Sequence, residues 1–419
     1  MYHIIHQITK LTFNQRFVIL LIVIMSTQFV AIEGFVTSPI KVSVMIFCIF
    51  FFFWKVPFIS KAVWCSIFYW NICLCIALFH DYFRFNTIAY LGMFLMAYIV
   101  YYHLIYMDTF SLCQFKKILS YMIYAYCIVL ILQQISVIVG IRNLGILNLA
   151  NNYLLSINNS YYDWNRLPIL SCEPSHSAKI ITTIMFGYIR CLEIEKGTKI
   201  SLAELFNKKN KWVSICFLWM IFMMGSGTGW VGFGILCLYF IQWRTFLYAI
   251  PIFIGIFFIL QNSGNEQFER AIKTTEATMT GNIQTINQAD GSSSTRVVPI
   301  LNTFIYSDLT QLESWIGNGT LSTKESKRSW MNFKRKIPIV EQYGFIGFFF
   351  SLLLIYTCAI KKIWSIETIL FFVLSMASLG NEYHIWSQMY IFTAIRFFQG
   401  NKELQVNKEH GCLNNYSEL

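Results

Sequence analysis

The sequence QNSGNEQFERAIKTTEATMTGNIQTINQADGSSSTR (residues 261–296) opens a polar stretch that runs to Gln342. This stretch is 82 residues long (342 − 261 + 1) and lies between two runs of apolar residues. A bundle of helices that only faces lipid has no need for such an insertion. We therefore expect the function to lie in this segment and on the neighbouring face of the bundle.

The composition predicts an integral membrane protein. Of the 419 residues, 56% are hydrophobic and 13% are charged, and the mean hydropathy is +0.54, which is too apolar for a soluble chain of this length. A helix that crosses a hydrocarbon core of about 30 Å needs roughly 20 apolar residues. Twelve runs have about this length or slightly less, at 17–35, 39–54, 62–79, 87–106, 118–140, 175–191, 212–226, 228–242, 245–260, 343–360, 363–380 and 384–399. The predicted fold class is all-α, a polytopic transmembrane helical bundle of about 12 spans, with the alternative that 212–242 forms one re-entrant unit.

The basic residues of the short loops predict the orientation of the bundle. With the N-terminus inside, Lys55, Lys116 and Lys361 fall on the cytoplasmic side, whereas the outward short loops carry little beyond Arg84, as the positive-inside rule requires. Three parts follow: 1–260 holds membrane helices 1–9 with an outer loop at 141–174, 261–342 is a large outer loop with short helices, and 343–419 holds helices 10–12 and a short frayed cytoplasmic tail. The net charge of +11 thus reflects topology and indicates no nucleic-acid partner, because the cations are dispersed over membrane-flanking loops.

The cysteines and histidines indicate neither a disulfide framework nor a metal site. Nearly all of the 12 cysteines lie within the predicted spans, which favours buried thiols that serve as small apolar side chains. His80, His103 and His384 are isolated from one another along the chain and have no carboxylate at metal-ligand spacing. We expect no metal and no cofactor.

The first candidate site is at the end of the outer loop 141–174, where Arg166, Glu173 and His176 precede or open a predicted span. Pro174 suits a first helical position, and Glu173 and His176 are three residues apart, so on a continuous helix they share a face. In the functional interpretation, a carboxylate takes a proton from a hydroxyl beside an arginine that holds an anion. The alternative is a helix cap with an interfacial ion pair.

Three further segments carry candidate residues. Residues 290–296 suggest a turn before a helix at 296–309, and exposed amides with the guanidinium of Arg296 suit a phosphate, although a solvated loop arginine is the alternative. A basic cluster near the outer surface could attract lipid head groups or a lipid-linked diphosphate, or simply anchor the loop; it comprises Lys324, Lys327, Arg328, Lys334, Arg335 and Lys336. Glycines four apart in residues 225–234 predict close helix packing.

These residues together resemble the O-antigen polymerase (Wzy-type) family of the bacterial inner membrane, which is related to the O-antigen ligases. The resemblance rests on Arg166 followed by Glu173-Pro-Ser at the head of a span, on Ser292-Ser-Ser-Thr-Arg296, on Gly317-Asn-Gly319, and on Asn332 followed by Glu341-Gln-Tyr-Gly344. It covers roughly 166–347. Many relatives carry Ser-Arg after the span at 212–226, and this chain has no arginine there. The ligases carry a histidine before the late-loop asparagine, whereas 261–342 contains none, which favours a polymerase over a ligase.

The resemblance implies a metal-independent glycosyltransferase of lipopolysaccharide biosynthesis. It would transfer a glycan chain from undecaprenyl diphosphate to the non-reducing end of a lipid-linked repeat unit on the periplasmic face, with both termini cytoplasmic. Arg166, Arg296 and Arg335 would bind the diphosphate, and Glu173 would be the base, with His176 as the alternative. The implied partners are the undecaprenyl-diphosphate-linked oligosaccharide, membrane lipid and a possible chain-length regulator protein. A flippase for the same lipid-linked sugar, another exporter and a non-enzymatic scaffold are the competing functions.

Overall fold

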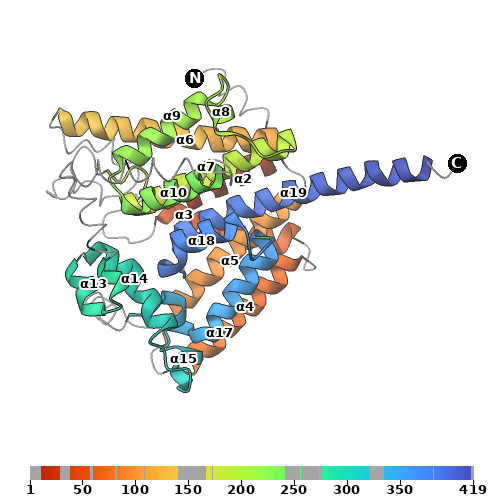
Figure 1. The fold of residues 1–419 in the computed structure, drawn as a ribbon. Helices are drawn as coiled ribbons and strands as arrows, with labels where there is room; N and C mark the ends of the chain where they lie inside the picture. Colours follow the sequence, from red (N-terminus) through yellow and green to blue (C-terminus); the bar gives the residue numbers. More distant parts are fainter. Residues whose placement is uncertain are drawn as a thin grey trace.

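The computed structural model describes residues 11–28, 38–56, 60–80, 83–107, 110–139, 167–171, 173–240, 276–289, 291–320, 335–380 and 382–416, with Gly255 and Lys273 between them. These residues form helices and no strand (Figure 1). The helices of the first half are α2 (Phe13–Ser26), α3 (Pro39–Lys55), α4 (Lys61–Leu78), α5 (Phe85–Tyr106), α6 (Leu112–Ile138), α7 (Pro174–Lys196), α8 (Leu202–Leu205), α9 (Lys211–Met223) and α10 (Gly227–Phe240). Those of the second half are α13 (Ile283–Ala289), α14 (Gly291–Phe304), α15 (Leu312–Ile316), α17 (Pro338–Leu354), the π-helix η2 (Ile355–Ala359), α18 (Ile366–Ser375), the 3₁₀ helix η3 (Met376–Ser378) and α19 (Tyr383–Tyr416). The predicted all-α class is confirmed for this part of the chain.

Four helices are long and apolar enough to cross a membrane: Lys61–Leu78, Phe85–Tyr106, Leu112–Ile138 and Pro338–Ala359. Shorter apolar helices cover Phe13–Ser26, Lys211–Met223, Gly227–Phe240 and Ile366–Ser378. Each matches a predicted run, whereas the run at 245–260 lies outside the described residues apart from Gly255. The helices therefore have the character of a membrane protein with several spans, and the total of about 12 stays a prediction.

Helix α7 is the centre of the bundle. It packs against α6, α10 and α19, and most of its residues are buried even though it carries several charges. Next to it, aromatic side chains join α5 to α19: the rings of Tyr101 and Tyr390 stack with centres 4.1 Å apart, and the Tyr98 hydroxyl is 2.8 Å from that of Thr393. Aromatic packing thus joins α5 to α19.

The described cysteines are all free thiols. Several are buried as predicted, among them Cys73 and Cys191, but Cys75 and Cys113 are exposed. The prediction of buried thiols is wrong for these two, because they lie on outward-facing helix surfaces that no other described helix covers.

Segments that the sequence assigns to one side of the membrane contact one another. At one end, His80 Nε2 lies 3.3 Å from the Ile316 carbonyl oxygen, and both belong to predicted outer loops. At the other end, Arg190 forms an ion pair of 2.9 Å with Glu367, and both belong to predicted cytoplasmic ends. The two sets of contacts agree with the grouping from the positive-inside pattern, although which end faces the cytoplasm stays a prediction.

Two local predictions are wrong. The serine-rich residues from Gly291 belong to α14, so Arg296 lies inside a helix and not at the end of a turn. Packing of α14 against α13 and η3 outweighs the preference of serine for turns and caps. The predicted frayed tail is also wrong, since α19 continues to Tyr416 and extends past the other helices in Figure 1.

The glycine motifs of the resemblance have a packing role in this fold. Gly317 and Gly344 have φ of 71° and 64°, a region that side chains with a Cβ rarely adopt. A Cβ on Gly344 would lie 2.1 Å from the Trp315 carbonyl oxygen. Asn318 N–H donates to the Glu341 carbonyl oxygen at 2.7 Å. This bond and the close backbone contact at Gly344 hold α15 against the start of α17.

Candidate functional site

Glu173 and His176 stand at the start of α7. Glu173 is at the N-cap position and Pro174 begins the helix, as predicted. The Glu173 side chain makes no hydrogen bond to the helix amides; it is exposed and accepts a hydrogen bond of 3.1 Å from the Ser175 hydroxyl. The capping alternative is therefore wrong for this carboxylate, which faces solvent at the end of the bundle.

The backbone that leads to Glu173 is held firmly. Ile169 has φ of 58°, an uncommon conformation for a β-branched residue. Its N–H donates to Oε1 of Gln133 at 3.1 Å and its carbonyl oxygen accepts from Nε2 of the same side chain at 3.0 Å. Ser177 Oγ donates to the Pro168 carbonyl oxygen at 2.6 Å. These bonds tie residues 167–171 to α6 and α7 and fix where the helix begins.

Glu382, between α18 and α19, lies near several other charged side chains at this end of the bundle. Its side chain is exposed, yet the surrounding protein displaces enough water to raise the pKa of its carboxyl above the ordinary value. Lys179 opposes this rise in pKa, Glu173 adds to it, and Arg335 and Lys41 oppose it. Two carboxylates from distant parts of the sequence thus share one group of cations.

A buried polar group extends from Glu382 into the bundle. Lys179 Nζ donates to the Ser378 hydroxyl at 3.0 Å and lies 3.1 Å from His384 Nε2. The rings of His176 and His384 have centres 4.7 Å apart. Lys179 is 7% exposed and His384 is fully buried, so the lysine ammonium depends on these neighbours as acceptors.

Arg296 and Arg335 reach the same place from the large loop. The charges of Arg296 and Lys179 both act on His176. Helix α14, which carries Arg296, packs against η3. Asn302 Nδ2 of α14 donates to the Arg335 carbonyl oxygen at 2.9 Å. This bond joins the segment at 335–337 to α14, and the charge of Arg335 acts on Glu382.

We call this group the charged cluster: Lys41, Glu173, His176, Lys179, Arg296, Arg335, Glu382 and His384. It contains four cations and two carboxylates, and Arg335 also acts on a third carboxylate, Glu341, so with neutral imidazoles these nine described residues carry a net charge of +1 (4 − 3). An excess of cations beside carboxylates suits an anionic ligand that reacts with a hydroxyl.

The cluster unites four of the five predicted site residues: Glu173, His176, Arg296 and Arg335. Arg166, and Lys324, Lys327, Arg328 and Lys334 of the basic cluster, lie outside the described residues, and Lys336 lies beside Glu341. The sequence interpretation missed Lys41, Lys179 and Glu382, and it treated His384 as isolated. Ionisable residues within or beside apolar spans were the signal for them, because such residues are rarely placed there without a role.

Two other features do not extend the site. In the described part of the chain, no three His, Cys, Asp or Glu side chains are grouped to hold a metal ion. A hollow of about 750 Å³ lies beside α13 and α14, and its lining has no charged side chain: Thr280, Gly281, Asn282, Ile283, Gln284, Asn302 and Tyr306. An anionic ligand fits the charged cluster better than this hollow.

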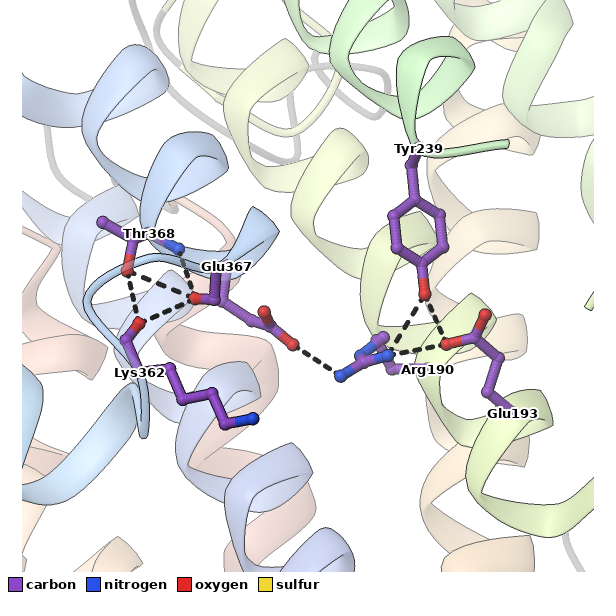
Figure 2. Close-up of polar contacts among 7 residues, drawn as sticks. Arg190, Glu193, Tyr239, Lys362, Glu367 and Thr368 are labelled. Atoms are coloured by element: carbon purple, nitrogen blue, oxygen red, sulfur yellow. Dashed lines mark hydrogen bonds and ion pairs between the residues drawn. The ribbon is translucent and has the colours of Figure 1, made fainter. Parts of the chain in front are cut away.

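A second polar network lies toward the other end of α7 (Figure 2). The guanidinium of Arg190 lies between Glu367 of α18, at 2.9 Å, and Glu193, at 2.7 Å. Tyr239 of α10 donates to Glu193 at 2.5 Å. Arg190 lies between two carboxylates and the contacts of this network join three helices, so we assign it to holding α7, α10 and α18 together.

The described chain is thus a helical protein with several membrane-type helices and a charged cluster at one end. No protein-family model, curated protein or solved structure matches this chain.

Proposed function

We propose that this protein is a metal-independent glycosyltransferase that polymerises a surface polysaccharide, such as O-antigen, on the periplasmic face of a bacterial inner membrane. It would transfer a glycan from undecaprenyl diphosphate to the non-reducing end of a lipid-linked repeat unit. One observation carries this proposal: α7, α14 and the segment at 335–337 meet in the charged cluster. These segments carry the residues to which the resemblance assigns the chemistry.

The reaction balances without a further reactant. The acceptor hydroxyl attacks the anomeric carbon of the donor glycan, the bond from that carbon to the diphosphate oxygen breaks, and the diphosphate leaves with the bonding electrons. Arg296 and Arg335 would stabilise the charge that develops on the diphosphate, with Arg166 as a third ligand. Lys179 adds a cation whose position is fixed by Ser378.

The hydroxyl proton passes to a base in the cluster. Glu173 is the first candidate and His176 the alternative, and the geometry adds Glu382, whose carboxyl lies among the same cations. A raised pKa makes a carboxylate a better proton acceptor near neutral pH. Both carboxylates lie at the end of the bundle where a lipid-linked sugar could approach from the membrane surface.

Polymerisation by the purified protein in proteoliposomes tests the proposal, with defined undecaprenyl-diphosphate-linked repeat units as the substrate. Arg296→Ala should lower the rate at least about 100-fold, as the loss of one donor to developing charge does. Glu173→Gln and Glu382→Gln identify the base, because the variant that lacks it should lose polymerisation while still binding substrate. Lys362→Ala is the matched control, since Lys362 is exposed and lies in the segment predicted to be cytoplasmic.

A cellular test follows from the same reasoning. A strain that carries Arg296→Ala as its single copy should make lipopolysaccharide with one repeat unit, and a normal ladder of chain lengths would refute the role of Arg296. A flippase defect differs, because it traps the lipid-linked unit inside the cell. A wild-type protein that forms no polymer in proteoliposomes would favour the flippase or scaffold.

A further inference from the structure

The start of α10 presents hydrogen-bond donors toward Arg296. The Trp230 N–H donates to the Ser226 carbonyl oxygen at 3.2 Å, so Ser226 is the N-cap residue. The amides of Gly227, Thr228 and Gly229 therefore precede the first bond within the helix, and such amides need an acceptor from elsewhere. With 14 residues, α10 is long enough for its dipole to place partial positive charge at this end.

Two buried hydroxyls stand at the same point. The Oγ of Ser226 and the Oγ1 of Thr228 have no hydrogen-bond partner among the described residues, and these residues are only 5% and 6% exposed. A serine at the N-cap usually bonds a helix amide, and this one does not. Buried hydroxyls without a partner are costly, so this part of the fold has hydrogen-bonding capacity that the described protein groups leave unused.

The guanidinium of Arg296 lies beside the start of α10. A Cβ built on Gly227 would lie 3.7 Å from Arg296 Nη1, and beyond its own helix and chain neighbours it would meet no other atom of the described residues within 4 Å. Guanidinium N–H groups and helix N-terminal amides are both donors and both positive, so they do not satisfy each other. An oxyanion beside both would accept hydrogen bonds from the amides and from the guanidinium.

The glycines of residues 227–232 have two different environments. Gly229 and Gly232 pack on α7, since a Cβ on them would lie 3.5 Å from Ala178 Cβ and 2.7 Å from Thr182 Oγ1, which agrees with the predicted close packing. Gly227 instead lies beside the guanidinium of Arg296 on α14. Ala178 lies between His176 and Lys179 along α7, so the start of α10 adjoins the charged cluster.

We propose that the start of α10 and Arg296 together form a phosphate-binding cradle. Its ligand is a tetrahedral phosphate group of a phosphate or diphosphate ester, held by the amides of residues 227–229, the hydroxyls of Ser226 and Thr228 and the guanidinium. The assignment deepens the proposed function and rests on it for the source of the phosphate, the polyprenyl diphosphate. The cradle supplies binding groups at the position where this chain lacks the arginine of the resembling family.

Binding to the full-length protein in nanodiscs tests the cradle without requiring polymerisation. The probes are undecaprenyl diphosphate, inorganic pyrophosphate and undecaprenol, which lacks phosphate. Gly227→Ala places a methyl group between the amides and Arg296, and Thr228→Val removes a hydroxyl at nearly constant volume. Gly234→Ala is the matched control in the same helix, because a Cβ there would meet no atom of the described residues within 4 Å beyond its own helix.

Both test variants should bind the diphosphate probes about tenfold or more weakly, which is the effect of losing a hydrogen bond to a charged group, and bind undecaprenol unchanged. Loss confined to undecaprenyl diphosphate identifies the lipid as the source, and equal loss for pyrophosphate identifies a site for free phosphate compounds. Diphosphate binding within twofold of wild type in Thr228→Val, with an unchanged thermal midpoint, would overturn the cradle. If Thr228→Val gives that result and the wild-type protein still polymerises, the cradle is rejected and the proposed function stands. If the cradle binds diphosphate but the wild-type protein forms no polymer, only the proposed function is rejected.

Discussion

Replacing Arg190 by alanine should destabilise the protein by about 3 kcal/mol, because it leaves partly buried carboxylates without their cation. The side chain of Arg190 is 24% exposed, and those of Glu193 and Glu367 are 7% and 13% exposed. Breaking a buried pair usually costs about 3–5 kcal/mol. The lower end applies here because Glu193 keeps the hydrogen bond from Tyr239, so most of the loss comes from Glu367.

The same helix offers a matched control. Lys196 pairs with Glu204, and their side chains are 48% and 37% exposed, so solvent screens this pair and Lys196→Ala should change the stability much less than Arg190→Ala does. Adding Glu367→Gln to Arg190→Ala should recover part of the lost stability, since it removes the uncompensated charge. A gain in stability from Glu367→Gln would show that the uncompensated charge causes the loss, because this substitution cannot restore the packing of the arginine side chain.

Reversible unfolding of the purified protein in mixed micelles measures these free energies. A difference of about 2 kcal/mol in stability corresponds to roughly 30-fold in the folding equilibrium. If the two variants were equally stable, or if Glu367→Gln worsened Arg190→Ala, the assignment of Figure 2 as a network that holds three helices together would be refuted.

Three further outcomes are expected. Gly187→Ala should lower the thermal midpoint by a cost of about 1–3 kcal/mol, because its Cβ would lie 2.8 Å from Ile391 Cγ2, and an unchanged midpoint would contradict this packing. Gly344→Ala should release α15 from α17 and speed proteolysis near residue 320, since φ at Gly344 is positive and its Cβ would meet the Trp315 carbonyl oxygen; equal proteolysis rates would argue against it. The pKa of Glu382 is raised in the folded protein, so folding binds a proton between the ordinary and the raised pKa and stability falls as pH rises through that window. Glu382→Gln should flatten this fall, and parallel curves of thermal midpoint against pH would exclude it.

The membrane-type helices were predictable because an apolar run of about 20 residues is long enough to cross a membrane as a helix. The run at 87–106 became α5 and the run at 118–140 became α6, with ends shifted by a few residues. Pro174 marked the start of α7 correctly because a proline fits the first turn of a helix and not its interior. The serines before Arg296 gave the wrong local structure, since their preference for turns is weaker than the packing of α14 on its neighbours.

The charged cluster was predictable only in part. Glu173 stood out because it lies at the edge of a polar segment, and Arg296 because it follows a run of small polar residues within one. Lys41 and Lys179 lie within predicted spans, where only contacts from distant elements reveal their partners: Lys41 donates to the Thr27 carbonyl oxygen at 2.9 Å and lies 4.4 Å from the centre of the Tyr383 ring. No spacing along the chain encodes such contacts.

The polarity of α7 explains why the site has this form. A helix with Lys179 near one end and Arg190 near the other would be costly in lipid, and it is stable here because neighbouring helices surround it and supply partners at both ends. At the Arg190 end, the guanidinium lies between Glu193 and Glu367 and the contacts join three helices, so we assign that end a structural role. At the Lys179 end the described cations outnumber the described carboxylates, and Arg296 lies beside the start of α10, an arrangement that suits an anionic ligand. The same burial that keeps α7 in place therefore holds several cations together at this end of the bundle, in keeping with the diphosphate that we propose as the ligand.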